Sequence, residues 1–419
     1  MMHPKELSIK DFTYQLPESN IALYPLSDRD SSKLLVYRNG NLSTDIYKNL
    51  ADHLPKGALL VLNNTRVIEA RIMFQKPSGG RIEIFCMEPA TDNNLSSALI
   101  KSQNPVKWKC LVGGASKWKA GQVLSKTGGP ANSFELSATY AGKRGETVWV
   151  EFAWNPELGN FGEVLHYFGA VPLPPYLRRA PEEMDSTRYQ TVYNHEPGSV
   201  AAPTAGLHFT PALFDRLETA SIQTAFLTLH VGAGTFKPVK AAVMAEHHMH
   251  EEFIRIDLST LRKFINTAPS LRFAVGTTSL RTLETAYWIG VKLHLAKISS
   301  SEDLVIHQWD PYSLTDNIDC NFALETLAKW MAEQDESELI TKTGILIAPG
   351  YRIRSIAGLI TNFHQPESTL LLLVAALVGE QWKEIYRYAL DNDFRFLSYG
   401  DGCLLFNPDL SSLSTASPA

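Results

Sequence analysis

Short apolar segments of strand length, each followed by a polar cluster, constrain the fold of this chain more than any other feature. Ala58–Leu62, Arg272–Val275 and Ile356–Ile360 are such runs. Apolar residues at helical spacing follow the second and third runs, and Thr210 with Pro211 has the residue types of a helix N-cap and first turn. Strands that alternate with helices predict an α/β sheet.

A central stretch of the chain departs from this alternation. Between residues 81 and 154, short strand-like runs are separated by Gly, Pro, Asn and Ser clusters, which predicts a small all-β barrel. The runs are Arg81–Glu88, Val106–Val112, Gln122–Lys126, Phe134–Tyr140 and Thr147–Ala153. We therefore expect a three-layer α/β core domain over residues 1–72 and 155–419, with the barrel inserted at residues 73–154. An extra segment at about residues 291–342 adds a polar stretch and an amphipathic helix to the core.

The composition of the chain excludes several classes of protein. The 419 residues are 44% hydrophobic and 20% charged, which excludes collagen-like and disordered chains. The longest apolar run, Leu370–Val378, is about half of the roughly 20 residues that a membrane-spanning helix needs. Residues 1–10 lack the apolar core of a secretory signal, and the 4 cysteines show no CxxC spacing. We expect a cytoplasmic protein without a membrane span, a disulfide framework or a zinc site.

Basic residues are concentrated locally rather than over the whole chain. The net charge of −5 gives no overall positive field for a nucleic acid. Lys107-Trp108-Lys109 and Lys117-Trp118-Lys119 alternate cations with aromatic rings, which suits a surface for single-stranded RNA. The alternative is that the tryptophans belong to the barrel core and the lysines are solvated. Arg178 and Arg179 form a further basic spot.

Polar clusters lie where predicted strands stop. They are Asn63–Arg66, His230–Thr235, Gly276–Arg281 and Thr361–His364. Ligands of open α/β sheets bind outside the carboxyl ends of the strands, where helix N-termini and free backbone N–H groups meet. Each cluster alone is typical of caps and turns. Together they predict one shared cleft.

Histidine is the side chain best suited to exchange protons near neutral pH, and the chain has 12 of them. Most of the following six lie at predicted loop or strand ends: His208, His230, His247, His248, His250 and His364. His247 and His250 could share a helix face as metal ligands, but the HExxH pattern is absent and no cysteine is near. We therefore expect no metal.

Glu284 and the turn at Gly232 and Gly234 are further candidates. Glu284 falls on the apolar face of a predicted helix, where a carboxyl group could retain and deliver a proton. The alternative is an ion pair with Arg281, three residues earlier. The glycine turn lacks the third glycine of GxGxxG, and no GxxxxGK[ST] occurs, so neither a standard dinucleotide site nor a P-loop is supported. The turn still allows a close backbone approach.

Ten ordered segments, spread nearly end to end, carry a resemblance to a known family. They are Phe12–Val36, Leu59–Arg71, Gly79–Phe85, Pro172–Arg179, Arg188–Thr210, Thr228–Val239, Glu246–Glu252, Val275–Glu284, Leu359–Leu377 and Phe394–Asp401. In these segments the chain resembles the S-adenosylmethionine:tRNA ribosyltransferase-isomerases of queuosine biosynthesis. The resemblance implies an α/β core with a small β-barrel insertion.

The resemblance also implies a reaction. The family transfers and isomerises the ribosyl moiety of S-adenosylmethionine onto 7-aminomethyl-7-deazaguanine at the tRNA wobble position. Adenine and methionine leave, and epoxyqueuosine is the product. The alternatives are a diverged paralogue that uses the same donor on another acceptor, and an RNA-binding protein of the same fold without catalysis. No cofactor is expected beyond S-adenosylmethionine as co-substrate, and we expect a monomer with tRNA as partner.

That chemistry assigns candidate roles to the residues. The sulfonium acidifies the adjacent 5′ carbon, so a base is needed, and the candidates are His208, His230 and His364. Glu284 is the expected acid or sulfonium partner. The expected substrate-binding residues are Asn64, Arg66, Thr204, Gly206, Gly232, Gly234, Thr235, Thr277, Thr278, Ser279, Arg281 and Asn362. The expected RNA-binding residues are Lys107, Lys109, Lys117, Lys119, Arg178 and Arg179.

Overall fold

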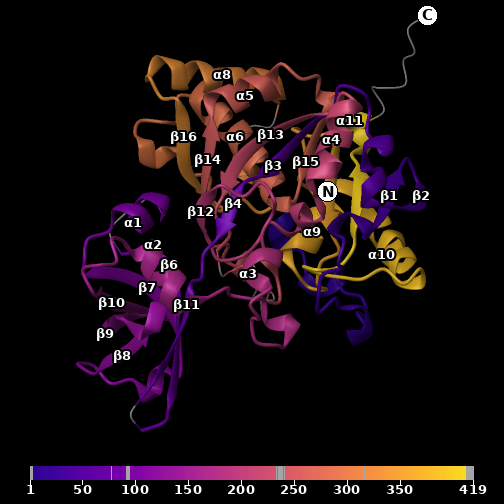
Figure 1. The fold of residues 1–419 in the computed structure, drawn as a ribbon. Helices are drawn as coiled ribbons and strands as arrows, with labels where there is room; N and C mark the ends of the chain where they lie inside the picture. Colours follow the sequence, from indigo (N-terminus) through magenta and orange to yellow (C-terminus); the bar gives the residue numbers. More distant parts are fainter. Residues whose placement is uncertain are drawn as a thin grey trace, which may run out of the picture.

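A nine-stranded mixed sheet forms the centre of the molecule (Figure 1). The computed structural model describes residues 3–76, 78–90, 95–232, 234, 239, 241–314 and 317–411. The strand order is β16-β14-β13-β3-β15-β17-β18-β1-β2. The strands are β1 Lys33–Arg38, β2 Asn41–Ile46, β3 Leu59–Asn63, β13 Gln223–Leu229, β14 Glu252–Asp257, β15 Arg272–Val275, β16 Glu338–Thr343, β17 Gly358–Asn362 and β18 Gly402–Phe406.

Strands β13, β3, β15 and β17 are parallel neighbours, so their carboxyl ends share one edge of the sheet. Every residue of β3 is buried, because successive side chains enter the cores on opposite faces. Leu59 and Val61 join the core of α5, α6, α8, α9 and α10, whereas Leu60 and Leu62 join that of α4. These helices are α4 Pro211–Thr219, α5 Leu258–Ile265, α6 Thr277–His294, α8 Cys320–Glu333, α9 Thr369–Val378 and α10 Trp382–Asp391. The predicted mixed α/β fold is confirmed.

A second sheet has seven antiparallel strands and lies to the lower left in Figure 1. Its order is β11-β5-β6-β7-β10-β9-β8. The strands are β5 Arg71–Gln75, β6 Arg81–Pro89, β7 Val106–Gly113, β8 Val123–Gly128, β9 Phe134–Arg144, β10 Thr147–Trp154 and β11 Gly169–Ala170. All the strand-like runs expected between residues 81 and 154 therefore form strands. Alternate residues of β10 are buried, the period-2 pattern of a sheet with one covered face.

This second sheet is curled into a half-barrel. Within the described residues, no backbone ladder joins its edge strands β8 and β11, so the closed barrel of our expectation is not formed by strand pairing. Helix α2 (Phe161–Phe168) contributes to the core of the sheet with α1 (Leu95–Lys101). The Lys126 Nζ atom of β8 donates to the Phe168 carbonyl, 2.8 Å away, just before β11. The end of α2, rather than a strand pair, thus connects the edge strands β8 and β11. The division into domains at residues 73 and 154 stays a prediction.

The segment at residues 291–342 belongs to the main body of the molecule. It contains η13 (Ser301–Leu304), α7 (Asp310–Ser313) and α8, and it leads into β16 at the end of the nine-stranded sheet. Further elements are β4 Thr65–Val67, β12 Glu196–Ser199, α3 Asp185–Arg188, α11 Pro408–Ser411, η5 Tyr47–His53, η9 Thr204–His208 and η11 Met244–Glu246.

All four cysteines are free thiols. No helix in the described ranges has the length and apolar character that a membrane crossing needs.

Candidate active site

A narrow cavity lies at the carboxyl ends of the parallel strands. Thr204 of η9, Gly276 to Thr278 at the start of α6, and Thr361 to His364 at the end of β17 line it. At Arg281 and Leu370 this first cavity, of about 110 Å³, adjoins a second one of about 830 Å³. Three of the four predicted polar clusters therefore contribute to one cleft, because parallel strands bring their carboxyl ends to the same edge.

The junction of β15 and α6 shapes one wall of the first cavity. Gly276 has φ of +89°, a conformation that side chains disfavour, and its N–H donates to the Ile360 carbonyl, 2.7 Å away. This turn places Thr277 and Thr278 in the first turn of an 18-residue helix. The N–H groups of a first turn have no partner within their helix, and the helix dipole is positive there. The wall therefore favours an anionic or hydrogen-bond-accepting group.

Arg281 is a buried cation at the boundary of the two cavities. Its Nη1 atom donates to Glu252 Oε2 from β14, and Glu252 Oε1 accepts from the Gly232 N–H at 2.8 Å. The Arg281 Nε and Nη2 atoms are buried, and neither has a hydrogen-bond partner in the part of the chain that the structure describes. Unsatisfied buried donors are costly, and a guanidinium fork matches a carboxylate. The side chain is therefore prepared for an anionic ligand.

His364 is the predicted base that lines the first cavity. Its Nε2 atom lies 3.0 Å from Thr361 Oγ1, and its backbone N–H donates to the Tyr386 hydroxyl at 3.1 Å. Burial lowers the pKa of the His364 imidazole to about 3, so the ring is neutral at pH 7. Next to it, Thr204 Oγ1 donates to Asn362 Oδ1 at 2.8 Å and fixes that amide.

A third cavity, of about 370 Å³, lies between the two sheets. Glu88 and Lys109 of the curled sheet line it together with His230 and His250 of the main body. It shares Gly234, Met249, His250 and Glu252 with the second cavity, so the two adjoin. The three cavities thus form a continuous series from the strand ends to the curled sheet.

His230 connects the main body to the curled sheet. Its Nδ1 atom lies 2.9 Å from Thr65 Oγ1, and its Nε2 atom lies 3.3 Å from Ser96 Oγ of α1. The Ser96 hydroxyl also donates to the Pro197 carbonyl at 2.8 Å. Burial lowers the pKa of His230 to about 4, which keeps the ring neutral.

The sequence matches one family of known proteins. The model of the family described as queuosine biosynthesis protein matches residues 9–405. This chain belongs to that family. The S-adenosylmethionine:tRNA ribosyltransferase-isomerase of Ralstonia nicotianae is 37% identical over 417 residues, which cover 97% of this chain and 98% of that protein. The protein of the same name from Caldanaerobacter subterraneus is 37% identical over 402 residues, covering 94% and 98%.

Two further relatives extend the comparison. The S-adenosylmethionine:tRNA ribosyltransferase-isomerase of Thermosynechococcus vestitus is 35% identical over 410 residues, covering 97% of this chain and 98% of that protein. A crystal structure of the S-adenosylmethionine tRNA ribosyltransferase from Thermotoga maritima is 27% identical, with a TM-score of 0.44 over 94% of this chain and 100% of that one. The family assignment rests on the sequence comparisons, and they confirm the resemblance predicted from the motifs.

Two residues predicted to act in this family's chemistry lie outside the three cavities. The Glu284 carboxylate accepts hydrogen bonds from the Tyr351 hydroxyl, from the backbone N–H groups of Arg354 and Ser355 at 3.0 and 2.8 Å, and from the Ser355 hydroxyl at 2.6 Å. The alternative of an ion pair between Glu284 and Arg281 is wrong, because Arg281 pairs with Glu252 instead. A catalytic role for Glu284 stays a prediction. The structure gives Glu284 the role of fastening the loop around Ser355 to α6.

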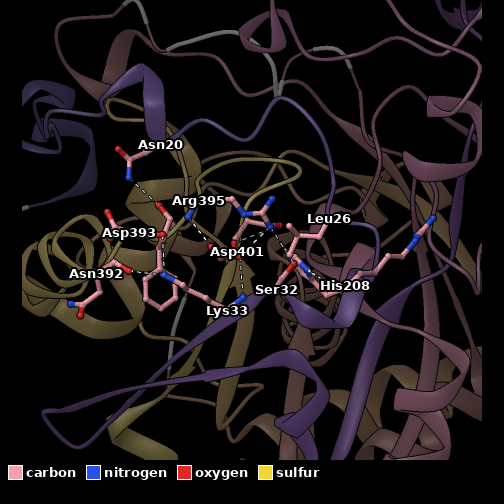
Figure 2. A network of polar contacts seen from close by, with 12 residues as sticks. Asn20, Leu26, Ser32, Lys33, His208, Asn392, Asp393, Arg395 and Asp401 are labelled. Atoms are coloured by element: carbon pink, nitrogen blue, oxygen red, sulfur yellow. Dashed lines mark hydrogen bonds and ion pairs between the residues drawn. The ribbon is translucent and has the colours of Figure 1, made fainter.

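His208 also lies outside these cavities, behind Asn362. Its ring stacks on Tyr47 with centroids 4.1 Å apart, and its Nδ1 atom lies 3.4 Å from the Arg29 carbonyl oxygen. Asn362 Nδ2 lies 3.4 Å from His208 Nε2. Figure 2 shows His208 beside the polar network of Asp401. Burial lowers the pKa of His208 to about 3, so its neutral ring supports the Asn362 amide from behind.

The other predicted substrate-binding residues divide into cavity-lining and packing residues. Gly232 and Gly234 line the third cavity. Asn64 Oδ1 accepts from the Thr228 hydroxyl at 2.7 Å, and Ser279 Oγ donates to the Val275 carbonyl at 2.8 Å, so both have structural partners. A Cβ atom on Gly206 would lie 1.9 Å from the Tyr193 hydroxyl, so this glycine serves close packing. Arg66 is exposed on β4, and Thr235 lies outside the described residues.

The predicted RNA surface of the curled sheet has its tryptophans inside. Trp108 and Trp118 are buried in the core of the sheet, so their rings are not available for stacking on bases. Of the flanking lysines, Lys107, Lys117 and Lys119 are exposed and Lys109 is half-buried. Lys107 lies 3.4 Å from Glu151 and Lys109 lies 2.9 Å from Glu88, measured between charged atoms. For the tryptophans, the core alternative is therefore correct.

The two predicted RNA-binding arginines are both in ion pairs. Arg179 makes a two-pronged contact with Asp185, with both N···O distances 2.7 Å. Arg178 donates to Glu18 at 2.6 Å on the exposed surface. Lys117 accepts, through its carbonyl, a hydrogen bond from Lys76 Nζ, and Lys119 precedes the turn to β8. Contact of these residues with RNA stays a prediction.

Sequence reasoning missed the residues at 247–250 as part of the cleft wall. His247, His248, Met249 and His250 line the second cavity. In the described residues no group of three or more His, Cys, Asp or Glu side chains is arranged to hold a metal ion. Burial and the nearby His250 and His248 lower the pKa of His247. The density of histidines in Glu246–Glu252 was the available signal, but the segment has no periodicity that shows which way its side chains point.

Proposed function

We propose that this chain transfers and isomerises the ribosyl moiety of S-adenosylmethionine onto 7-aminomethyl-7-deazaguanine at the wobble position of tRNA. The products are epoxyqueuosine, adenine and methionine. Membership of the queuosine biosynthesis family and the names of its relatives support the reaction class. The single observation that carries the donor site is the buried Arg281 with two unpartnered donors between the first and second cavities.

In this proposal Arg281 binds the carboxylate of the methionyl portion of the donor. A carboxylate bridging Nε and Nη2 would satisfy both unpartnered atoms with charge-assisted hydrogen bonds. Glu252 holds the guanidinium from the opposite side, which fixes the direction of the free donors. The adenosyl portion then occupies the first cavity, whose lining includes apolar Ala201, Val231 and Leu370. The Thr278 hydroxyl, which is buried and unpartnered among the described groups, supplies a polar contact there.

His364 is the proposed base among the three histidine candidates, because it alone of them lines the first cavity. A ring held neutral by burial has a nitrogen lone pair, whereas a protonated ring would have none. Proton removal from the carbon beside the sulfonium starts the rearrangement, and a proton must reach adenine as it leaves. Thr361, which contacts His364 Nε2, sets the orientation of the ring.

The acceptor base reaches the donor from the side of the curled sheet. The third cavity adjoins the second and is lined by residues of both sheets. Lys107, which is exposed, and Lys109, which is half-buried and lines the third cavity, lie on that sheet and are proposed to contact the tRNA backbone. We further propose a cytoplasmic monomer with S-adenosylmethionine as co-substrate and no metal, in which residues 73–154 form an inserted barrel-like domain on a three-layer core.

The test is the release of free adenine from S-adenosylmethionine by the full chain. We expect release that depends on tRNA carrying 7-aminomethyl-7-deazaguanine, and none with tRNA carrying guanine at that position. Adenine release with a different acceptor alone would favour the diverged paralogue. No adenine with either tRNA, together with retained tRNA binding, would favour a non-catalytic RNA-binding protein and overturn the proposed reaction.

A further inference from the structure

The segment at residues 247–250, called here the histidine strap, forms a wall of the second cavity without regular secondary structure. It runs between η11 and β14, and its four residues lie in no helix or strand. His250 lies against the Gly234 backbone, since a Cβ atom on Gly234 would be 2.4 Å from His250 Cδ2. His250 also lines both the second and the third cavity. The position of the strap must therefore be set by contacts from elsewhere in the chain.

One side chain makes two such contacts. Gln308 Oε1 accepts from the Met249 N–H, and Gln308 Nε2 donates to the His247 carbonyl, both at 2.9 Å. A single planar amide thus bonds the backbone donor and acceptor of residues two apart, as a neighbouring strand would. An adjacent contact supports the same region, since His307 Nδ1 lies 2.9 Å from Glu251 Oε1.

Gln308 is itself fastened to the helix that presents Arg281. Asp310 Oδ2 accepts from the His307 N–H at 3.0 Å and lies 2.7 Å from Lys292 Nζ of α6. Lys292 Nζ also donates to the Val305 carbonyl at 2.8 Å. A single helix therefore carries Arg281 near its start and, near its end, the lysine that holds the turn around Gln308.

We propose that Gln308 is a positioning residue, which clamps the histidine strap at a fixed place relative to Arg281 and so holds His250 in the wall that the second and third cavities share. This inference rests on the proposed function for its catalytic consequence, but the clamp itself is a property of the free protein. A misplacement of about 1 Å, even one caused by a change far from the reacting atoms, can lower turnover roughly 100-fold in enzymes. Loss of the clamp affects turnover more than donor binding, because Arg281 and the first cavity keep their own contacts.

The test compares Gln308→Ala and Gln308→Glu with Gln334→Ala, a matched change at an exposed glutamine in the same 291–342 segment. Hydrogen–deuterium exchange of residues 244–252 in the full chain is the first measurement. We expect the Met249 amide to exchange at least about tenfold faster in Gln308→Ala, with a smaller increase in Gln308→Glu, which keeps the acceptor for that amide but loses the donor to His247. The control should exchange like the wild type.

Adenine release is the second measurement. We expect kcat to fall roughly 10- to 100-fold in Gln308→Ala, with KM for S-adenosylmethionine changed less than about threefold and partial recovery in Gln308→Glu. Unchanged exchange at Met249 overturns the clamp. Two results overturn the catalytic role of the clamp. One is faster exchange at Met249 with an unchanged kcat, and the other is an equal loss of kcat in both Gln308 variants and in Gln334→Ala. A wild type that releases no adenine contradicts the proposed function instead, and the exchange result still decides the clamp.

Discussion

The two sheets of this molecule place their polar residues by different rules. In the nine-stranded sheet, the residues that follow β15 and β17 meet in one cavity because parallel strands end at the same edge. In the curled sheet, alternation along β7 buries Trp108, whereas Lys107 is exposed and Lys109 is half-buried. The comparison teaches that strand ends gather functional groups, whereas positions within an antiparallel strand mainly separate core from surface.

The largest effect that would test this contrast is a loss of stability on substitution of Trp108. The ring is fully buried and lies 4.9 Å from the Phe161 ring, centroid to centroid. We expect Trp108→Ala to lower the free energy of unfolding by about 3–5 kcal/mol, as for other large-to-small core changes. Urea unfolding measures this, with Trp108→Phe as the milder control. A stable Trp108→Ala variant that has lost only tRNA affinity would contradict the core assignment and indicate that Trp108 contacts RNA.

The next effect concerns donor binding at the strand ends. We expect Arg281→Met to weaken S-adenosylmethionine binding about 100-fold, or roughly 2.7 kcal/mol, because the donor carboxylate loses its two charge-assisted bonds. Titration calorimetry without tRNA measures it. Arg281→Met also leaves Glu252 buried without its cation, so Arg281→Met combined with Glu252→Gln is the control for folding. Wild-type affinity in the double variant would refute the carboxylate site.

Acid should destabilise the protein through its buried histidines. Burial lowers the pKa values of His208, His230 and His364 from 6.5 to about 3, 4 and 3. Between pH 6.5 and these values the unfolded chain binds more protons than the folded one, so stability falls as the pH falls. Each ring contributes a slope of up to about 1.4 kcal/mol per pH unit. Urea unfolding from pH 7 to 4.5 measures it, and His208→Asn should make the dependence shallower. An equal slope in both proteins would contradict the neutral assignment of His208.

The smallest effect is expected at the two lysines of β7 in the curled sheet. Lys107→Gln and Lys109→Gln should each weaken tRNA binding only a few-fold and reduce the salt slope by about one, as for single phosphate contacts. Binding measured at several salt concentrations tests this. Lys329→Gln, an exposed lysine of α8, is the control. A change in donor affinity in either variant would contradict their assignment to the RNA surface.

The sequence predicts the elements better than the directions of individual side chains. The strands, the helices that follow them and the gathering of Thr277, Thr278 and Asn362 follow from local pattern and parallel topology. Glu284 does not, because its partners Tyr351 and Ser355 lie about 70 positions along the chain and bind its carboxylate away from the cleft. Nothing near Glu284 in the sequence indicates those contacts.

For the histidine strap, too, the sequence did not predict the direction of the side chains. His247 and His250 were recognisable as chemistry-bearing residues, but a segment without helical or strand period gives no direction for its side chains. Their placement depends on Gln308, which follows them by about 60 positions. Similarly, the contact between Lys126 of β8 and the end of α2 joins residues about 40 positions apart, and no local pattern in the sequence indicates it.

Helix α6 fixes the distance between Arg281 and Lys292, the lysine that holds the turn around Gln308. Arg281 and Lys292 are about 16 Å apart along its axis, at 1.5 Å per residue. The Lys292–Asp310 ion pair and the bridge from Ile306 to Thr343 fix the chain on the far side of the connection after α6. The intervening residues 295–303 can therefore gain or lose length on the surface while the distance from Arg281 to the strap stays the same.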